Sequence, residues 1–192
     1  MNKFHDSLQK YLDIYAGQET YFSNDTRSLE FYKEYPLNKN RQDIIQKISV
    51  IADADLHKFN AQDDLADHIL KLNIDPRLAK GDLSVVEDIA KLTLNGVGKN
   101  LLHAASEYCN LHRPDVFPIY SEQHFPFYKQ YIKEHKLGIN PEDLNQYQVF
   151  AKALNDIIDR YHIRGKLNYL QMRKFAWIYA AKVLAEAHPS KD

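Results

Sequence analysis

The stretch from Leu94 to Lys99, Leu-Asn-Gly-Val-Gly-Lys, has two glycines and a lysine where a chain could bind a phosphate group. Glycine permits positive φ angles and lets another molecule approach the backbone closely. If a helix begins just after Gly98, its first amides have no intrahelical acceptor and lie at the positive end of the helix dipole. Such amides suit a phosphate oxygen, and Lys99 adds a positive charge beside them. The structural alternative is that Gly96 ends one helix and Gly98 only eases the turn.

A second group of candidate residues follows in the segment Val116-Phe117-Pro118-Ile119-Tyr120-Ser121 and in Glu122 after it. A carboxylate placed beside a reacting atom can stabilise developing positive charge or deprotonate a water molecule. Glu122 is the acid closest to the end of this segment, and Asp115 is the next. The alternative for Glu122 is an acid in the first turn of a helix, which the helix dipole stabilises.

Apolar residues recur at helical spacing along most of the chain, and no alternating run is long enough to require a sheet. The sequence therefore predicts an all-α fold, with about eight helices in one compact unit. The last predicted helix, about 169–187, should be well buried because Trp177 and Ile178 broaden its apolar face. The other predicted helices cover about 3–15, 41–59, 62–72 and 99–110, or begin at the capping box of Ser84 and Glu87, near Pro126 and after Asn140.

The order of these motifs resembles the helix-hairpin-helix superfamily of DNA glycosylases, as a divergent member. In that superfamily a Leu-Pro-Gly-Val-Gly hairpin between two helices is followed, about two dozen residues later, by a hydrophobic-Pro-Val-Asp segment whose aspartate is catalytic. Here Gly96 and Ser121 are 25 positions apart. The resemblance covers about residues 84–125, and elsewhere it rests on helical content and length.

The resemblance implies one glycosylase-like domain over 1–192, with the helix-hairpin-helix at about 84–110 and the catalytic-loop equivalent at about 114–125. It further implies an active-site cleft between two lobes, and DNA as the partner. Asn100 stands where bifunctional members carry the lysine that forms a Schiff base, which implies a monofunctional enzyme. The implied DNA-binding residues are Asn95, Gly96, Val97, Gly98 and Lys99.

The sequence departs from the superfamily where the catalytic acid should stand, because Tyr120 or Ser121 occupies that position. Breaking an N-glycosidic bond builds positive charge on the sugar, and a nearby carboxylate would stabilise that charge. We therefore expect Glu122 to substitute, or a serine or tyrosine to position water for a good leaving group. The predicted catalytic residues are Glu122, Ser121, Tyr120 and Asn100.

An enzyme that excises a base must also hold the extruded base between aromatic or apolar side chains. The chain has 13 tyrosines and 9 phenylalanines, most of which we expect in the core. The predicted base-pocket residues are Tyr21, Phe22, Tyr32 and Gln123.

Composition limits which metal sites, disulfides, charged surfaces and locations we expect. The nine histidines form no metal-binding spacing, so we expect no metal and no cofactor. The single cysteine, Cys109, should be a buried small hydrophobe, and it excludes an internal disulfide. The net charge is −1, with residues 1–95 acidic and 96–192 basic, so a polyanion surface should lie on the second half. Without a membrane-spanning run or signal peptide, we expect a cytoplasmic monomer.

These patterns leave three hypotheses. The first is a monofunctional DNA glycosylase that flips and excises a modified or damaged base and leaves an abasic site, in repair or in defence against modified phage DNA. The second is a non-catalytic helix-hairpin-helix protein that binds DNA or a partner and has lost the catalytic acid. In the third, the hairpin is purely structural in an unrelated helical protein.

Overall fold

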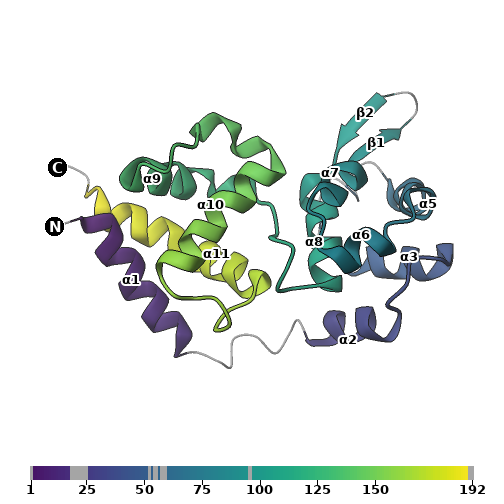
Figure 1. The fold of residues 1–192 in the computed structure, drawn as a ribbon, viewed down its shortest axis with the longest axis horizontal. Helices are drawn as coiled ribbons and strands as arrows, with labels where there is room; N and C mark the ends of the chain where they lie inside the picture. Colours follow the sequence, from purple (N-terminus) through teal and green to yellow (C-terminus); the bar gives the residue numbers. More distant parts are fainter. Residues whose placement is uncertain are drawn as a thin grey trace. The chain divides into compact units, whose positions relative to one another are not determined.

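The computed structural model describes residues 2–17, 26–51, 53, 56, 60–94 and 97–189. Over these residues the fold is all-α, as predicted, with one short pair of β-strands. The chain divides into two compact units (Figure 1). Unit 1 combines Met1–Ser23 with Ser121–Asp192, and unit 2 is the continuous stretch Asn24–Tyr120. No described helix has both the length and the apolar character needed to cross a membrane.

Unit 1 is built around the packing of its first helix against its last (Figure 1). Phe4, Leu8, Leu12 and Tyr15 form the buried stripe of the first helix. The Tyr15 hydroxyl donates a hydrogen bond to the Gln171 carbonyl over 2.8 Å. The elements of unit 1 are α1 (Lys3–Ala16), the 3-10 turn η2 (Glu122–His124), α9 (Phe125–His135), the 3-10 turn η3 (Pro141–Asn145), α10 (Tyr147–Arg160) and α11 (Tyr169–Ala187).

Polar caps in the sequence fix where the elements of unit 1 begin. Asn168 and Gln171 form a reciprocal capping box at the start of α11, with hydrogen bonds of 2.9 and 2.8 Å. Asn140 accepts a hydrogen bond from the Glu142 amide over 3.3 Å, as its position before Pro141 indicates. The turn that follows is a short 3-10 helix, and the long helix begins only at Tyr147.

Trp177 does not broaden the buried face of α11 as predicted, because this residue is 72% exposed. The core face of α11 instead carries Phe175 and Tyr179, whose rings contact Tyr15 of α1. Trp177 and Tyr179 are two residues apart, so they lie about 200° apart around the helix and cannot share one face. An α-helix with apolar residues on several sides does not reveal from its sequence which side the core will cover.

Unit 2 is organised around α8 (Leu102–His112), the last of its helices. This helix buries Leu102 and every residue from Ala104 to Leu111. The helices that precede it are α2 (Thr26–Glu34), α3 (Arg41–Ser49), α5 (Gln62–Leu72), α6 (Asp75–Lys80) and α7 (Ser84–Ala90). The helix predicted over 41–59 therefore ends earlier, at Ser49, whose hydroxyl bonds back to the Gln46 carbonyl over 2.7 Å.

Candidate functional site

The predicted phosphate-binding turn lies in a β-hairpin, so the helix-hairpin-helix prediction is wrong. Strands β1 (Lys91–Leu94) and β2 (Val97–Asn100) pair antiparallel, with Leu94 opposite Val97 and Thr93 opposite Gly98. The next helix begins only at Leu102, so the backbone of 97–99 does not form its first turn. The physical reason is the alternation of buried and exposed residues along β1, which is the period of a strand.

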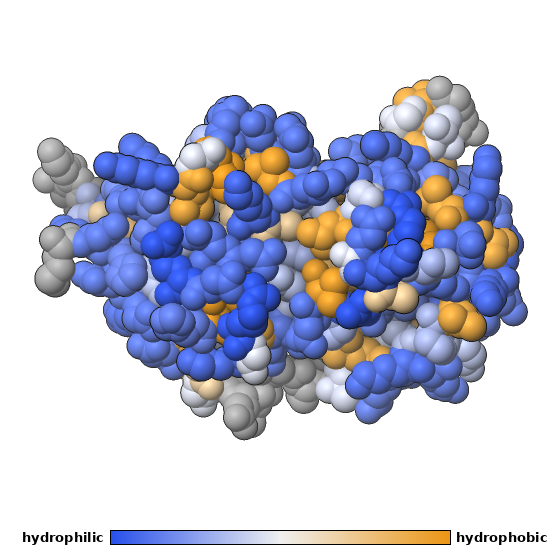
Figure 2. Space-filling view, viewed as in Figure 1, coloured by the Kyte–Doolittle hydropathy of each residue, from blue (hydrophilic) through white to orange (hydrophobic). Residues whose placement is uncertain are grey.

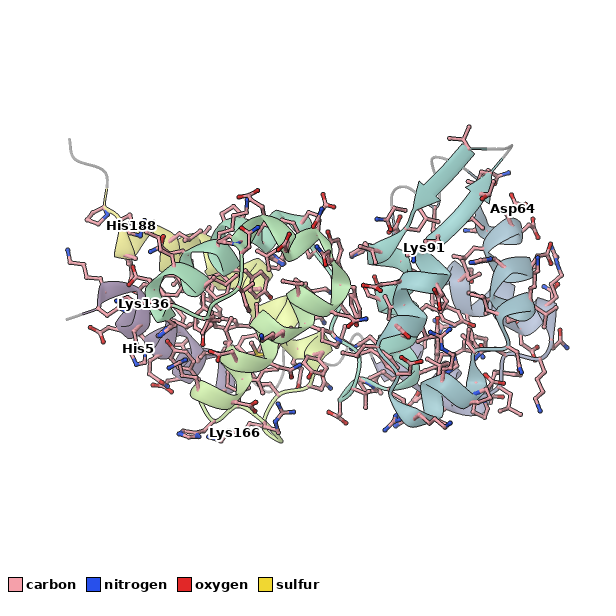
Figure 3. The ribbon with its side chains drawn as sticks, turned by 45° about the horizontal axis from the view of Figure 1, so that its top comes forward. His5, Asp64, Lys91, Lys136, Lys166 and His188 are labelled. Carbon is pink, nitrogen blue, oxygen red and sulfur yellow. The ribbon has the colours of Figure 1, made fainter. Side chains whose placement is uncertain are left out.

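The hairpin presents most of its described residues to solvent. Val97, Gly98 and Asn100 are exposed, and Val97 is 56% exposed. A Cβ atom added at Gly98 would meet nothing within 4 Å, so this position is open above the strand. Lys91 at the start of the hairpin is also exposed, and Figure 3 labels its side chain. Asn95 and Gly96 lie outside the described residues, as does the side chain of Lys99.

The segment that the resemblance assigns to the catalytic loop is held against α8 by two buried side chains. The side-chain amide of Asn110 donates a hydrogen bond to the Phe117 backbone carbonyl over 2.7 Å. The Ser106 hydroxyl accepts from the Tyr120 amide over 2.9 Å. Because buried polar groups need partners, these bonds fix the course of 117–120 along the helix. Tyr120 itself is 3% exposed.

The other predicted catalytic residues have different environments. Ser121 is 4% exposed, and its hydroxyl has no hydrogen-bond partner. Glu122 is exposed in η2, and so is Gln123, which was predicted for the base pocket. These three residues belong to unit 1, whereas Asn100 belongs to unit 2. The cleft between two lobes stays a prediction.

Tyr32 was predicted to line a pocket for the extruded base, and this prediction is wrong. Tyr32 is 2% exposed, and its hydroxyl donates to the Lys47 carbonyl over 3.0 Å. Its ring packs edge-on against Tyr108 and His112. It is therefore a core residue of unit 2 and cannot stack on an extruded base. Tyr21 and Phe22 lie outside the described residues.

A cluster of one histidine and two acids lies in unit 2, and we call Asp53, His103 and Glu107 the His103 cluster. The Nδ1 atom of His103 is 2.9 Å from the Asp53 carboxylate. Its Nε2 atom is 3.8 Å from the Glu107 carboxylate. The His103 side chain is 31% exposed, whereas the Asp53 and Glu107 side chains are 7% and 8% exposed.

Helix α8 and the connection after α3 position this cluster. His103 and Glu107 lie one turn apart on α8, so their side chains share a face. Asp53 lies in the connection after α3, where its other carboxylate oxygen accepts a hydrogen bond from the Leu56 amide over 2.9 Å. The hydrogen bond from the Leu56 amide holds the Asp53 carboxylate in place, and this carboxylate in turn orients the His103 imidazole.

The geometry of the His103 cluster suits proton transfer. If the carboxylate of Asp53 accepts a hydrogen bond from the Nδ1–H group, the neutral imidazole has its free lone pair on Nε2. Nε2 can then take a proton from water, and Glu107 stabilises the imidazolium that forms. Among the described residues, no group of three histidine, cysteine or acidic side chains is arranged to hold a metal ion.

Sequence reasoning missed Asp53 and Glu107. The spacing of His103 and Glu107 on one predicted helix was a usable signal, because residues four apart on a helix are neighbours. Asp53 is 50 residues away in sequence and reaches His103 only through tertiary packing. No local pattern could have found it.

Two other buried groups in unit 2 are structural. The sulfur of Cys109 is buried, as predicted, and burial raises the pKa of its thiol far above the ordinary value. Lys47 is fully buried, and burial lowers its pKa to about 8. Its ammonium donates to the Leu37 carbonyl over 2.9 Å and to Asn38 over 3.0 Å. These bonds tie α3 to the segment before it.

A family model described as HI_0787_N, N-terminal domain, matches residues 7–116. The chain belongs to this family. A Haemophilus influenzae relative, described as an uncharacterized protein, is 26% identical over 125 residues, which cover 64% of this chain and 59% of the relative. The match therefore covers less than two thirds of that protein. No solved structure matches the chain.

The part of the chain that matches the HI_0787_N domain contains the hairpin and the whole His103 cluster. It ends before Tyr120 and Ser121. Within the matched residues, the candidate for chemistry is therefore the His103 cluster, formed by two residues of α8 and by Asp53 from the connection after α3.

Proposed function

We propose that this chain is a monofunctional DNA glycosylase whose proton-transfer groups are the His103 cluster. The observation that carries the proposal is a partly exposed imidazole held between two buried carboxylates, one of them 2.9 Å away. An imidazole oriented in this way can activate a water molecule as a general base. The exposed Glu122 is a further candidate for the catalytic carboxylate that the resemblance to DNA glycosylases implies.

The proposed reaction is hydrolysis of the bond between the sugar C1′ and the base nitrogen. Water adds to C1′, the C–N bond breaks, and its electron pair leaves with the base. His103 removes the proton of the attacking water, and that proton finally reaches the departing base or solvent. A carboxylate near the sugar stabilises its oxocarbenium-like charge in the transition state. Asp53 orients the imidazole, and Glu107 stabilises its charged form.

DNA as the substrate is supported by two observations. The segment 116–121, which resembles the glycosylase catalytic loop, follows α8 directly, and its residues Phe117 and Tyr120 bond to that helix. The sequence of unit 1 has 13 lysines and arginines against 11 acids, whereas unit 2 has 12 against 15. A polyanion would therefore be attracted mainly to unit 1.

The test is base excision by the purified chain. Single-stranded and duplex oligonucleotides, each with one alkylated, oxidised, deaminated or hypermodified base, are incubated with the protein and treated with hot alkali. A monofunctional enzyme should produce strand breaks only after alkali, because it leaves an intact abasic site. His103→Gln should lower the excision rate by roughly 10²–10⁴-fold, which is the usual contribution of a general base.

Matched variants separate the chemical roles. Asp53→Asn and Glu107→Gln keep the shape of each side chain and should slow excision, whereas His188→Gln changes an exposed histidine and should leave the rate unchanged. Glu122→Gln tests the second carboxylate. If the wild-type chain excises none of these bases, the glycosylase proposal is wrong.

The alternative function is DNA binding without catalysis. The exposed hairpin favours it, because Val97 and the open Gly98 offer a surface that another molecule can approach. In that case fluorescence anisotropy with labelled DNA should report binding by the wild-type chain, with no excision of any base. Gly98→Leu should then weaken binding, and the melting temperature should stay close to that of the wild type.

A further inference from the structure

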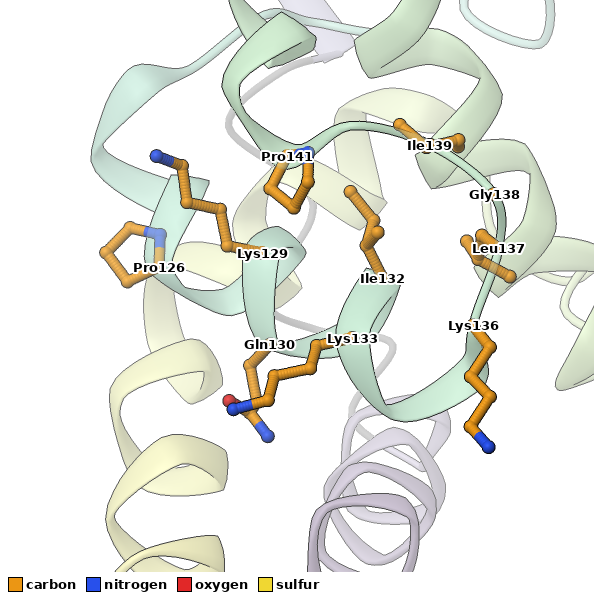
Figure 4. A pocket seen from close by; sticks show the side chains of 10 residues that line it. All are labelled: Pro126, Lys129, Gln130, Ile132, Lys133, Lys136, Leu137, Gly138, Ile139 and Pro141. Carbon is orange, nitrogen blue, oxygen red and sulfur yellow. The ribbon is translucent and has the colours of Figure 1, made fainter.

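A shallow hollow on unit 1 forms along one side of α9 and under the turn that leads to η3 (Figure 4). Its volume is about 630 Å³. All of its lining residues lie between Pro126 and Pro141, so it belongs to one continuous stretch of chain. The His103 cluster lies in unit 2, and the proposed reaction makes no use of this hollow.

Lysines surround the hollow. Lys129, Lys133 and Lys136 line it, and their side chains end at separate points around it in Figure 4. Lys133 and Lys136 are exposed, and no described residue forms an ion pair with them. Lys129 pairs with Glu142 over 2.7 Å, but Glu142 is 75% exposed, so this ion pair is weak.

The floor of the hollow is aliphatic. Ile132 is buried at its base, and Leu137 and Ile139 are half-buried along its side (Figure 4). Pro126 and Pro141 also line it. No aromatic ring lines it, so it has no face on which a nucleic-acid base could stack.

The backbone around the hollow is held in place by its own hydrogen bonds. Lys136 ends α9 in the left-handed conformation with a φ of 50°, and its amide bonds to the Ile132 carbonyl. The Leu137 amide bonds to the same carbonyl over 3.3 Å. At the other end Asn140 caps η3. A surface that is already formed costs little ordering when it binds a ligand.

We propose that this hollow binds an acidic peptide segment of a partner protein, with an aliphatic side chain of the peptide on its floor. The ring of lysines complements aspartate and glutamate on either side of that anchor. The aliphatic floor complements the anchor itself. A nucleic-acid strand would satisfy the lysines but would leave the floor uncovered.

The probe is a fluorescein-labelled peptide with two adjacent leucines between runs of aspartate and glutamate, and its binding to the full chain is measured by anisotropy. The double variant Lys133→Gln/Lys136→Gln should bind the probe roughly tenfold more weakly. The control Lys152→Gln/Lys166→Gln removes the same charge from exposed positions outside the hollow, and should change binding less than about twofold. Replacing the two leucines of the probe with serine should also weaken binding by about tenfold.

Three results would overturn the proposal. The first is no binding of the probe by the wild-type chain. The second is equal weakening by both double variants, which would indicate general electrostatic attraction. The third is displacement of both peptide probes, with leucines or with serines, by an unlabelled single-stranded oligonucleotide at the same concentration. The displacement would also have to depend on Lys133 and Lys136. That result would assign the hollow to nucleic acid.

Discussion

Burial controls the charge of single residues in unit 2. His112 packs against the rings of Tyr32 and Tyr108, and its Nε2 atom is buried without a hydrogen-bond partner. Burial, with a smaller effect from the nearby Lys47, lowers the pKa of His112 to about 3. The folded protein therefore holds this imidazole neutral at every pH above that value. An unfolded chain would protonate it near pH 6.5.

The first prediction concerns acid stability. Between pH 6.5 and 3 the unfolded chain binds a proton at His112 that the folded chain does not, so stability falls as the pH falls through this window, by up to about 1.4 kcal/mol per pH unit. His112→Phe keeps an aromatic ring and removes this proton, so it should flatten the pH dependence. Urea unfolding at pH 7 and 4.5 measures the difference.

The same variant should be at least as stable as the wild type at pH 7, because it removes a buried nitrogen that has no partner. His188→Phe alters an exposed histidine and should leave the pH dependence intact. Equal losses of stability in wild type and His112→Phe between pH 7 and 4.5 would contradict the neutral, buried state of His112.

At the scale of elements, a single cap sets the start of the longest helix. Asn168 accepts a hydrogen bond from the Gln171 amide, and Gln171 accepts one from the Asn168 amide. Asn168→Ala should destabilise the protein by about 1 kcal/mol, because it leaves an amide at the start of α11 without its partner. Asn168→Asp keeps the acceptor and is the control. Thermal unfolding followed by circular dichroism compares the three proteins, and an unchanged midpoint in Asn168→Ala would refute the role of the cap.

The sequence predicted the helices better than it predicted what joins them. Helices with a clear apolar stripe, such as α1 and α10, were predicted from their spacing, and so was the cap at Asn140. The hairpin was missed because four-residue strands are too short to outweigh a helical interpretation. Its signal was nevertheless present, since Leu92 and Leu94 alternate with polar residues and are followed by Asn-Gly, the preferred dipeptide of two-residue hairpin connections.

The candidate site was predicted less well than the fold. Nearness in sequence drew attention to Glu122, whereas the buried acids of the His103 cluster come from a helix face and from a segment 50 residues away. Figure 2 illustrates a related difficulty, because its mostly hydrophilic surface includes hydrophobic patches that no periodic pattern indicates. Which apolar residues stay exposed depends on tertiary packing.

At the scale of the whole molecule, unit 1 is discontinuous in sequence and unit 2 is inserted into it. His5 of α1 and Lys136 at the end of α9 are both labelled in Figure 3 and mark these two helices of unit 1. In the core of unit 1, Phe4 of α1 packs against Phe127 and Tyr131 of α9. Helix α1 therefore depends for its burial on residues more than 100 positions away in the sequence.

The third prediction tests this dependence. A specific protease site is inserted between residues 17 and 26, and the chain is cut there. The α1 peptide should co-elute with the remainder in size-exclusion chromatography, because Leu8 and its neighbours stay buried in unit 1. In a Leu8→Asp version of the same protein, the peptide should separate. Free elution of the wild-type peptide after cutting would show that the α1 packing does not hold unit 1 together.

This arrangement also has a consequence during synthesis. At roughly 5–20 residues per second, the ribosome finishes α1 about 5–20 s before it begins the segment after Tyr120. During that interval the nascent chain can fold unit 2, whose residues are contiguous, while the apolar stripe of α1 has no native surface to cover it. Helix α1 is thus synthesised before unit 2 but packed only after it, and its apolar stripe is a segment that a chaperone would be expected to bind.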